Sequence, residues 1–145
     1  MGQVSAASTI LINAEPAATL AAVADYATVR PKILSPHYSE YQVLQGGQGP
    51  GTVVKWKLQA TKSRVRDVQV DVDVAGHTVI EKDENSSMVT SWTVAPAGDG
   101  CSVTVKTTWN GAGGIGGFFE KTFAPLGLKK IQSEVLTNLK NELES

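Results

Sequence analysis

Apolar and polar residues alternate along most of the first 110 residues, and this two-residue period predicts a β-rich domain. The clearest alternation runs from Arg64 to Val74. Valines occupy every second position from Val68 onwards, and polar residues lie between them. Such a strand belongs to a sheet with one buried and one solvated face. The same character predicts six further strands, at 4–14, 38–44, 52–60, 77–83, 87–95 and 102–110.

The pattern changes to a helical period near the C-terminus. Apolar residues recur there at three- and four-residue spacing and form one stripe, made of Leu128, Ile131, Val135, Leu139 and Leu143. Pro125 lies inside the apolar run that opens this segment, so we expect a kink there or a break between a first piece, 118–123, and the main helix.

Two shorter helical segments are expected between the first and second strands. Glu15-Pro16 is a suitable opening for an alanine-rich helix at 17–24, because proline is tolerated in the first turn. Pro31 and Pro36 then restrict the chain to a turn or a one-turn helix.

The order of these elements is one strand, two short helices, six strands and one long helix. Seven antiparallel strands cannot bury their apolar face alone, and the final helix is the element able to cover it. We therefore predict a single α+β domain over residues 1–145 with a helix-grip fold, in which a curved seven-stranded antiparallel sheet wraps around the long C-terminal helix.

Short motifs in this order resemble the START-like (SRPBCC) superfamily, which includes polyketide cyclases and dehydratases, lipid-transfer domains and pollen-allergen proteins. The segment 12–16, the Asp25-Tyr26 pair and the turn Gly49-Pro50-Gly51-Thr52 match that pattern. The chain departs from it after Pro31, where relatives usually carry a tryptophan and this chain has Lys32 and Ile33. The resemblance implies an apolar cavity between the sheet and the final helix.

Composition narrows the classes of partner. The chain has 145 residues, a net charge of -1 and a pI near 6.1, so nucleic acid is not an expected partner. No stretch approaches the ~20 apolar residues of a membrane helix, so stable membrane insertion is not expected either. Its single cysteine, Cys101, cannot form an internal disulfide. The N-terminal residues lack the pattern of a signal peptide. We expect a cytoplasmic protein that is a monomer or a weak dimer.

The predicted phase of the strands places all three tryptophans on inward positions. An indole offers apolar surface and one hydrogen-bond donor, which suits a cavity that binds an apolar molecule through one polar group. Core packing alone explains each tryptophan about equally well. The predicted cavity residues come from the strands, the final helix and its approach: Trp56, Leu58, Arg66, Val68, Val70, Trp92, Trp109, Phe119, Phe123, Ile131 and Val135.

Arg64 and Arg66 share the phase of the buried valines. If both point inwards, they need a carboxylate or an anionic ligand group, because an unpaired buried arginine is very costly. The alternative is that a bulge at the strand start turns them outwards, and strand ends favour this alternative.

Signals for catalysis and metal binding are weaker. The weak catalytic candidates are Arg64 or Arg66 as stabilisers of an enolate, with His37, Tyr38 or Tyr41 as acid or base. The two histidines lack neighbours at metal-ligand spacing, and the glycine run 111–117 lacks the lysine of a phosphate loop. No cofactor or metal is predicted.

Three functions remain open from the sequence. The favoured hypothesis is binding or transport of an apolar small molecule such as a lipid, a polyketide or a sterol-like compound. The first alternative is an aromatase, cyclase or dehydratase acting on a polyketide-like substrate, and the second is a regulatory or toxin-like partner protein. Binding is favoured because no proton donor and acceptor can be paired on the inner face from the sequence.

Overall fold

A computed structural model describes residues 3–61, 64–110 and 125–144 of the chain. Seven strands form one sheet, and three helices are described with it. The strands are β1 (Gln3–Ile12), β2 (Tyr38–Gln45), β3 (Val53–Thr61), β4 (Arg64–Ala75), β5 (Thr78–Asp83), β6 (Val89–Ala97) and β7 (Gly100–Asn110). The helices are α1 (Pro16–Val23), α2 (Arg30–Ile33) and α4 (Pro125–Glu144).

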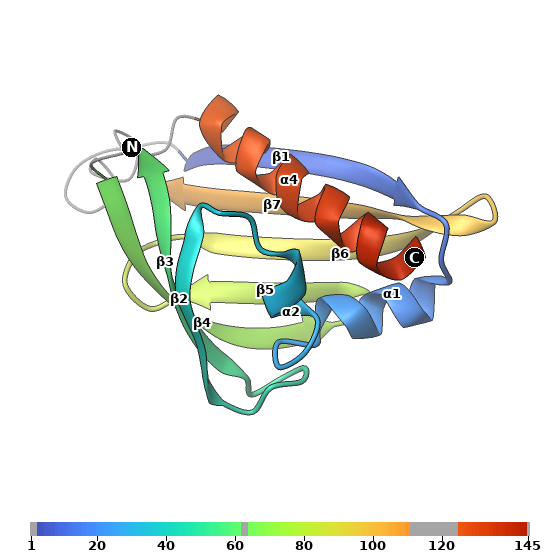
Figure 1. Ribbon diagram of the computed structural model, residues 1–145, viewed down its shortest axis with the longest axis horizontal. Coiled ribbons are helices and arrows are strands. Elements are labelled where there is room, and N and C mark those ends of the chain that lie inside the picture. The colour runs from blue at the N-terminus through green and yellow to red at the C-terminus, as the bar shows by residue number, and fades with distance from the viewer. Residues whose placement is uncertain (1–2, 62–63, 111–124, 145) are drawn as a thin grey trace.

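Every neighbouring pair of strands is antiparallel, and the spatial order is β1-β7-β6-β5-β4-β3-β2. Strands β2 to β7 thus follow one another as a meander, while β1 pairs with β7 at the far edge. The sheet is strongly curved, so that β2, β3 and β4 cross the direction of β6 and β7 (Figure 1). The predicted α+β helix-grip fold is confirmed.

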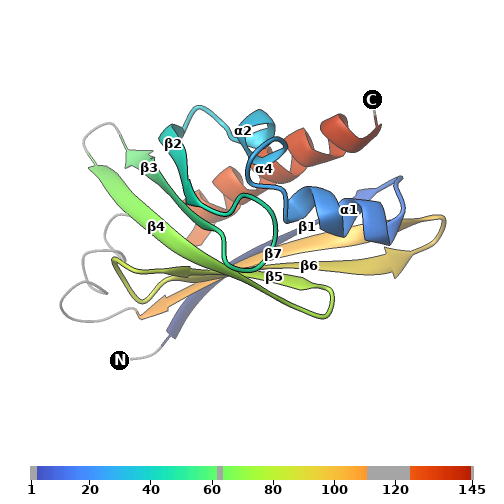
Figure 2. The same cartoon turned by 90° about the horizontal axis from the view of Figure 1, so that it is seen from below.

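All three described helices lie on the same, concave side of the sheet (Figure 2). Helix α4 crosses this side above β1, β7 and β6 (Figure 1). Helix α1 packs against β5, β6 and β7, and α2 packs against α4. Among the described residues, no helix is both long and apolar enough to span a membrane.

The core follows the predicted alternation. On β4, Val68, Val70 and Val72 are buried, and the three tryptophans of the chain are buried with them. On α4, the residues of the predicted stripe face the sheet: Leu128, Ile131, Val135 and Leu139 are buried, and Leu143 is half-buried. The helix begins at Pro125, and the predicted first piece, 118–123, lies outside the described residues.

A glycine-rich turn between β2 and β3 fixes the position of the chain after α1. Gly47 accepts hydrogen bonds from the backbone N–H groups of Tyr26 and Ala27 (2.9 and 3.1 Å) through its carbonyl oxygen. Gly46 has a φ of 71°, and a Cβ there would lie 2.9 Å from the Cα of Thr52, so this position requires glycine. The turn therefore holds Tyr26 at the inner face of the sheet.

Candidate functional site

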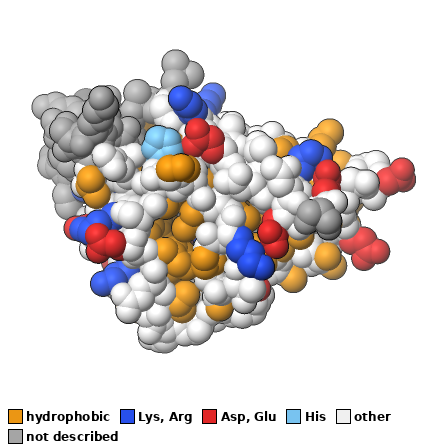
Figure 3. All heavy atoms as spheres, in the orientation of Figure 1, with side chains coloured by type: hydrophobic (Ala, Val, Ile, Leu, Met, Phe, Trp, Pro, Cys, Tyr) orange, Lys and Arg blue, Asp and Glu red, His pale blue; other side chains and the backbone are white. Residues whose placement is uncertain are grey.

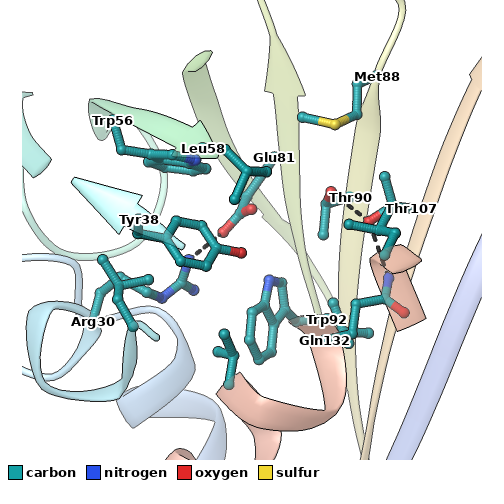
Figure 4. Close-up of a pocket in the computed structure, with 14 residues that line it drawn as sticks. Arg30, Tyr38, Trp56, Leu58, Glu81, Met88, Thr90, Trp92, Thr107 and Gln132 are labelled. Carbon is teal, nitrogen blue, oxygen red and sulfur yellow. Dashed lines mark hydrogen bonds and ion pairs between the residues drawn. The ribbon is translucent and has the colours of Figure 1, made fainter. Parts of the chain in front are cut away.

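A cavity of about 50 Å³ lies between the concave side of the sheet, α4 and the segment that contains α2. Hydrophobic side chains gather in a hollow at the centre of the face seen in Figure 3. The described residues that line the cavity come from seven elements and from the α2–β2 and β5–β6 connections: Arg30, Leu34, Tyr38, Trp56, Leu58, Glu81, Met88, Thr90, Trp92, Val105, Thr107, Leu128, Gln132 and Val135 (Figure 4).

The structure brings some of the predicted cavity residues together and separates others from the cavity. Four of them line it: Trp56, Leu58, Trp92 and Val135. Five others are not among its lining residues: Arg66, Val68, Val70, Trp109 and Ile131. Four of these five are fully packed core residues, and Arg66 is half-buried. Phe119 and Phe123 lie outside the described residues.

A buried ion pair forms one end of the cavity. Arg30 Nη1 lies 2.7 Å from Glu81 Oε2, and both side chains are at most 5% exposed. Arg30 Nη2 also donates to the carbonyl oxygen of Val23 at 3.0 Å. Its guanidinium lies over two rings, 4.3 Å from the centre of Tyr26 and 4.7 Å from that of Trp92. The arginine is thus held by charge, hydrogen bonds and aromatic faces together.

Local sequence explains how this pair is placed. Asp25 follows α1 and tightens the next turn, because its Oδ1 accepts from Thr28 N at 2.9 Å and its carbonyl oxygen accepts from Arg30 N at 3.0 Å. On β5 the alternation buries Val79, Glu81 and Asp83. The turn before Pro31 therefore places Arg30 beside the carboxylate of Glu81, which points inwards from β5.

Tyr26 completes the cluster. Its hydroxyl donates to Glu81 Oε2 at 2.5 Å, and its side chain is fully buried. Its carbonyl oxygen accepts a 2.5 Å hydrogen bond from the Tyr41 hydroxyl. Glu81 Oε2 thus receives both the phenol and the guanidinium, while Oε1 accepts no hydrogen bond from the described residues.

The electrostatics keep these groups in defined protonation states. Burial is the main cause that raises the pKa of Tyr26, Tyr38 and Tyr41 well above the usual value for a phenol. Burial acts to lower the pKa of Arg30, but the neighbouring Tyr26 and Glu81 outweigh it and the pKa is raised. At neutral pH the cluster therefore holds a charged arginine and neutral tyrosines.

Two buried indole nitrogens at the cavity have no hydrogen-bond partner among the described residues: Trp56 Nε1 and Trp92 Nε1. Figure 4 shows the indole nitrogen of Trp92 and the hydroxyl of Tyr38 turned towards the space between them. A buried N–H group without a partner costs about 1–3 kcal/mol, so most buried tryptophans find one. The cavity therefore presents donors that its own walls do not satisfy.

A second polar group lies at the opposite end of the cavity. The hydroxyls of Thr90 and Thr107 are 2.9 Å apart, and Gln132 Nε2 donates to Thr107 Oγ1 at 3.2 Å and to the carbonyl oxygen of Ala6 at 3.1 Å. Ser8 Oγ donates to Gln132 Oε1 at 3.2 Å. These side chains form hydrogen bonds with one another and with the backbone, so the polar groups at this end of the cavity already have partners.

The predicted catalytic candidates do not converge. Tyr38 lines the cavity, whereas Arg66, His37 and Tyr41 are not among its lining residues. Arg66 lies opposite Leu58 in the register of β3 and β4. The side chain of Arg64 lies outside the described residues. The described residues contain no group of three or more His, Cys, Asp or Glu side chains able to hold a metal ion.

Three polar contacts join the α2 region to one face of α4. Glu134, Asn138 and Glu142 lie four residues apart, which puts them on the same side of the helix. Each has a partner in the α2 region: His37 Nε2 lies 3.4 Å from Glu134 Oε1, Asn138 Nδ2 donates to the carbonyl oxygen of Ile33 at 2.9 Å, and Lys32 Nζ lies 3.7 Å from Glu142 Oε2. We call these contacts the α2–α4 row. They hold the segment that contributes Leu34 and Tyr38 to the cavity.

The sequence analysis missed the Arg30–Glu81 pair. The signal was present, because the alternation of β5 puts Glu81 in phase with Val79. A carboxylate in the apolar phase of a strand needs a cationic or hydrogen-bonding partner. Arg30, between two buried segments, was available as that partner.

Comparisons with known proteins identify the family and the fold of this chain. A family model described as polyketide cyclase/dehydrase and lipid transport matches residues 3–144. The KanY protein (ms6282), whose solution structure was determined by NMR, is 76% identical, with 100% of each chain covered and a TM-score of 0.92. No curated protein matches the sequence.

More distant structures share the fold. The protein TTHA0849 from Thermus thermophilus is 13% identical, with 97% of each chain covered and a TM-score of 0.78. The Zhui aromatase/cyclase from Streptomyces sp. R1128 is 12% identical, with 99% of this chain and 94% of that chain covered, and also has a TM-score of 0.78. At such identities the likeness concerns the fold alone.

Proposed function

Because this chain belongs to the polyketide cyclase/dehydrase and lipid-transport family, we propose that it binds an apolar small molecule between the sheet and α4. The observation that carries the proposal is the cavity itself, where apolar walls meet buried donors that the described protein leaves unpaired. Ligand sites in proteins combine a mostly apolar lining with a few polar groups in this way.

The size of the cavity sets a condition on binding. Its volume of about 50 Å³ is far below the ~300 Å³ of a drug-sized site. A lipid, a polyketide or a sterol-like compound, the ligands expected from the sequence, is therefore larger than this space. Bulky side chains such as Trp56 and Trp92 occupy that space, and a ligand enters only if the walls separate.

A cavity-filling variant tests the proposal. Titration with the neutral dye Nile red should give saturable fluorescence enhancement with the wild-type protein. Val135→Phe adds a ring to the α4 side of the cavity and should weaken dye binding by about tenfold or more. Thr137→Phe adds the same ring to an exposed position of α4 and should leave binding unchanged. Equal binding by all three proteins would place the dye elsewhere and contradict the proposal.

A second candidate function is proton transfer on a bound ketone. It is favoured by one observation: Tyr38 and Glu81 line the same cavity, and Glu81 Oε1 accepts no hydrogen bond from the described residues. In such a step Glu81 would take a proton from the carbon beside the carbonyl group, and Tyr38 would donate a proton to the oxygen, giving the enol. The proton on Glu81 would then exchange with solvent, and the reverse transfers, from Glu81 to the carbon and from the enol oxygen to Tyr38, would complete the exchange and restore both residues.

Deuterium exchange tests this second function directly. In D2O, the methyl-ketone protons of 2-acetonaphthone should exchange faster with the wild-type protein than with buffer alone, as followed by proton NMR. Tyr38→Phe should abolish the acceleration while it leaves ketone binding within about threefold. Exchange at the buffer rate in the presence of bound ketone would leave binding as the function of the site.

A further inference from the structure

The charges around the cavity cancel before any ligand binds. Among the described lining residues, Arg30 is the cation and Glu81 is the anion, and they form one ion pair with a separation of 2.7 Å. Arg30 Nη1 and Nη2 both donate to protein oxygens, and two aromatic rings lie against the guanidinium, whereas its buried Nε has no hydrogen-bond partner among the described residues. The described lining thus lacks the excess positive charge that a buried carboxylate ligand needs.

The unpaired N–H donors at the cavity favour a neutral ligand with an oxygen acceptor over a carboxylate. Trp56 Nε1 and Trp92 Nε1 are buried donors without described partners, and the residues that carry them are at most 7% exposed. An indole N–H is neutral and only donates, so it pairs with an oxygen acceptor without balancing a charge. A ketone or phenol oxygen meets this need, whereas a pure hydrocarbon leaves the donors unpaired.

From these observations we propose that the cavity selects neutral, apolar molecules that carry a ketone or phenol oxygen, and discriminates against carboxylic acids. The oxygen accepts from the indole N–H of Trp92 or Trp56, and the Tyr38 hydroxyl is turned towards the same space (Figure 4). A carboxylate brings a net charge that the Glu81 carboxylate repels and that Arg30, already neutralised, does not balance. This inference rests on the proposed binding function and names its ligand class.

Four naphthalene probes of one shape test the inference by NMR titration of ¹⁵N-labelled protein: naphthalene, 2-naphthol, 2-acetonaphthone and 2-naphthoate. The ketone and the naphthol should bind about tenfold or more tightly than the naphthoate at a pH of about 7.5, and several-fold more tightly than naphthalene. They should shift the indole N–H signals of Trp56 or Trp92 more than that of Trp109. Naphthoate binding as tight as ketone binding, or bound ketone with unchanged Trp56 and Trp92 signals, would overturn the inference.

A tryptophan variant separates this inference from the proposed function. Trp92→Phe and Trp56→Phe each remove one N–H donor and keep an aromatic ring, so in at least one of them ketone affinity should fall to about that of naphthalene while naphthalene affinity changes little; an unchanged ketone preference in both variants would overturn the inference. Trp109→Phe, at a buried tryptophan that is not among the lining residues, is the matched control and should keep the preference for the ketone. If naphthalene, ketone and naphthoate bind equally, the binding function stands and the ligand class is wrong. If no probe binds, both fail.

Discussion

Glu81 is the residue on which the inner polar cluster depends. Its Oε2 accepts from Tyr26 and pairs with Arg30, and all three side chains are buried. Removal of one partner from a buried ion pair leaves the other charge uncompensated, which is far more costly than loss of the attraction alone. The carboxylate is therefore needed for the stability of the fold as well as for the character of the cavity.

The substitution Glu81→Gln tests this dependence. It removes the negative charge while Arg30 stays buried and charged, so the free energy of unfolding should fall by about 3–5 kcal/mol. Urea denaturation followed by circular dichroism measures the change. The exposed substitution Asp99→Asn should change stability by less than about 0.5 kcal/mol. A Glu81→Gln protein as stable as wild type would show that Arg30 is not charged, or not buried, in solution.

The tyrosines give a second prediction at the residue scale. The chain has three tyrosines, and burial raises the pKa of each of them. In the unfolded chain a tyrosine ionises near pH ~10. Because the folded pKa values lie higher, the stabilising contribution is fully present below pH ~10 and is lost as pH rises towards the folded pKa values.

Absorbance of ionised phenol in the near ultraviolet should therefore stay flat through pH ~10 and rise only together with loss of the circular dichroism signal of the folded protein. Substitution of Tyr41 by Phe should leave this coupling intact, because the pKa values of the two remaining tyrosines are also raised. A phenol that ionises with a midpoint near ~10 in protein that stays folded would contradict the placement of that tyrosine.

Residue-scale prediction from the sequence was incomplete for a physical reason. Alternation within a strand predicts which face a residue joins, so the inward tryptophans and the valines of β4 were predicted correctly. This alternation does not predict which turn of the chain packs against the buried face of the sheet. The pairing of Arg30 with Glu81 depends on the turn after α1, and its register is fixed by backbone contacts to the Gly47 loop that no periodicity reveals.

Helix α4 is the element that closes the core. Its buried stripe faces the sheet, and Val135 contributes both to the core and to the cavity wall. The three- and four-residue spacing of apolar residues predicted this face without tertiary information, because the period of a helix is fixed by its geometry. The polar Gln132 on the buried side was not predicted, since its partners lie on β1 and β7.

A charge on the buried face of α4 should be strongly destabilising. Val135→Asp places a carboxylate against the sheet and should lower the free energy of unfolding by several kcal/mol. Thr137→Asp puts the same charge on the exposed face and should have a small effect. Thermal and urea denaturation of both variants measure the difference. Equal melting of Val135→Asp and wild type would mean that the helix register is wrong.

The α2–α4 row gives a prediction about motion of the cavity wall. Asn138→Ala removes the hydrogen bond to the carbonyl oxygen of Ile33, which is worth about 1 kcal/mol. Amide hydrogen exchange of residues 32–38 should become about fivefold faster, while exchange in β6 and β7 stays unchanged. Thr137→Ala is the matched control on the same helix. Unchanged exchange in 32–38 would show that the row does not hold this segment.

At the scale of the whole molecule, the described sheet curves around α4, with α1 and α2 on the same side, and the proposed ligand site is the space between the sheet, α4 and the segment that contains α2. The fold was predictable from the sequence because element order and periodicity specify it. The volume was not, because about 50 Å³ is the small space left after side chains from seven elements have packed. Substitution of one lining side chain changes the cavity volume but leaves the hydrophobic periodicity of the sequence unchanged.

The central claim is that an apolar ligand binds inside this space, and intermolecular NOEs test it most directly. Protein labelled with ¹³C at its methyl groups is mixed with unlabelled 2-acetonaphthone, and NOEs between ligand and protein are recorded. The account predicts NOEs to methyl groups that line the cavity: Leu58, Met88, Val105, Leu128 and Val135. NOEs confined to exposed residues such as Leu44 and Val65 would contradict it.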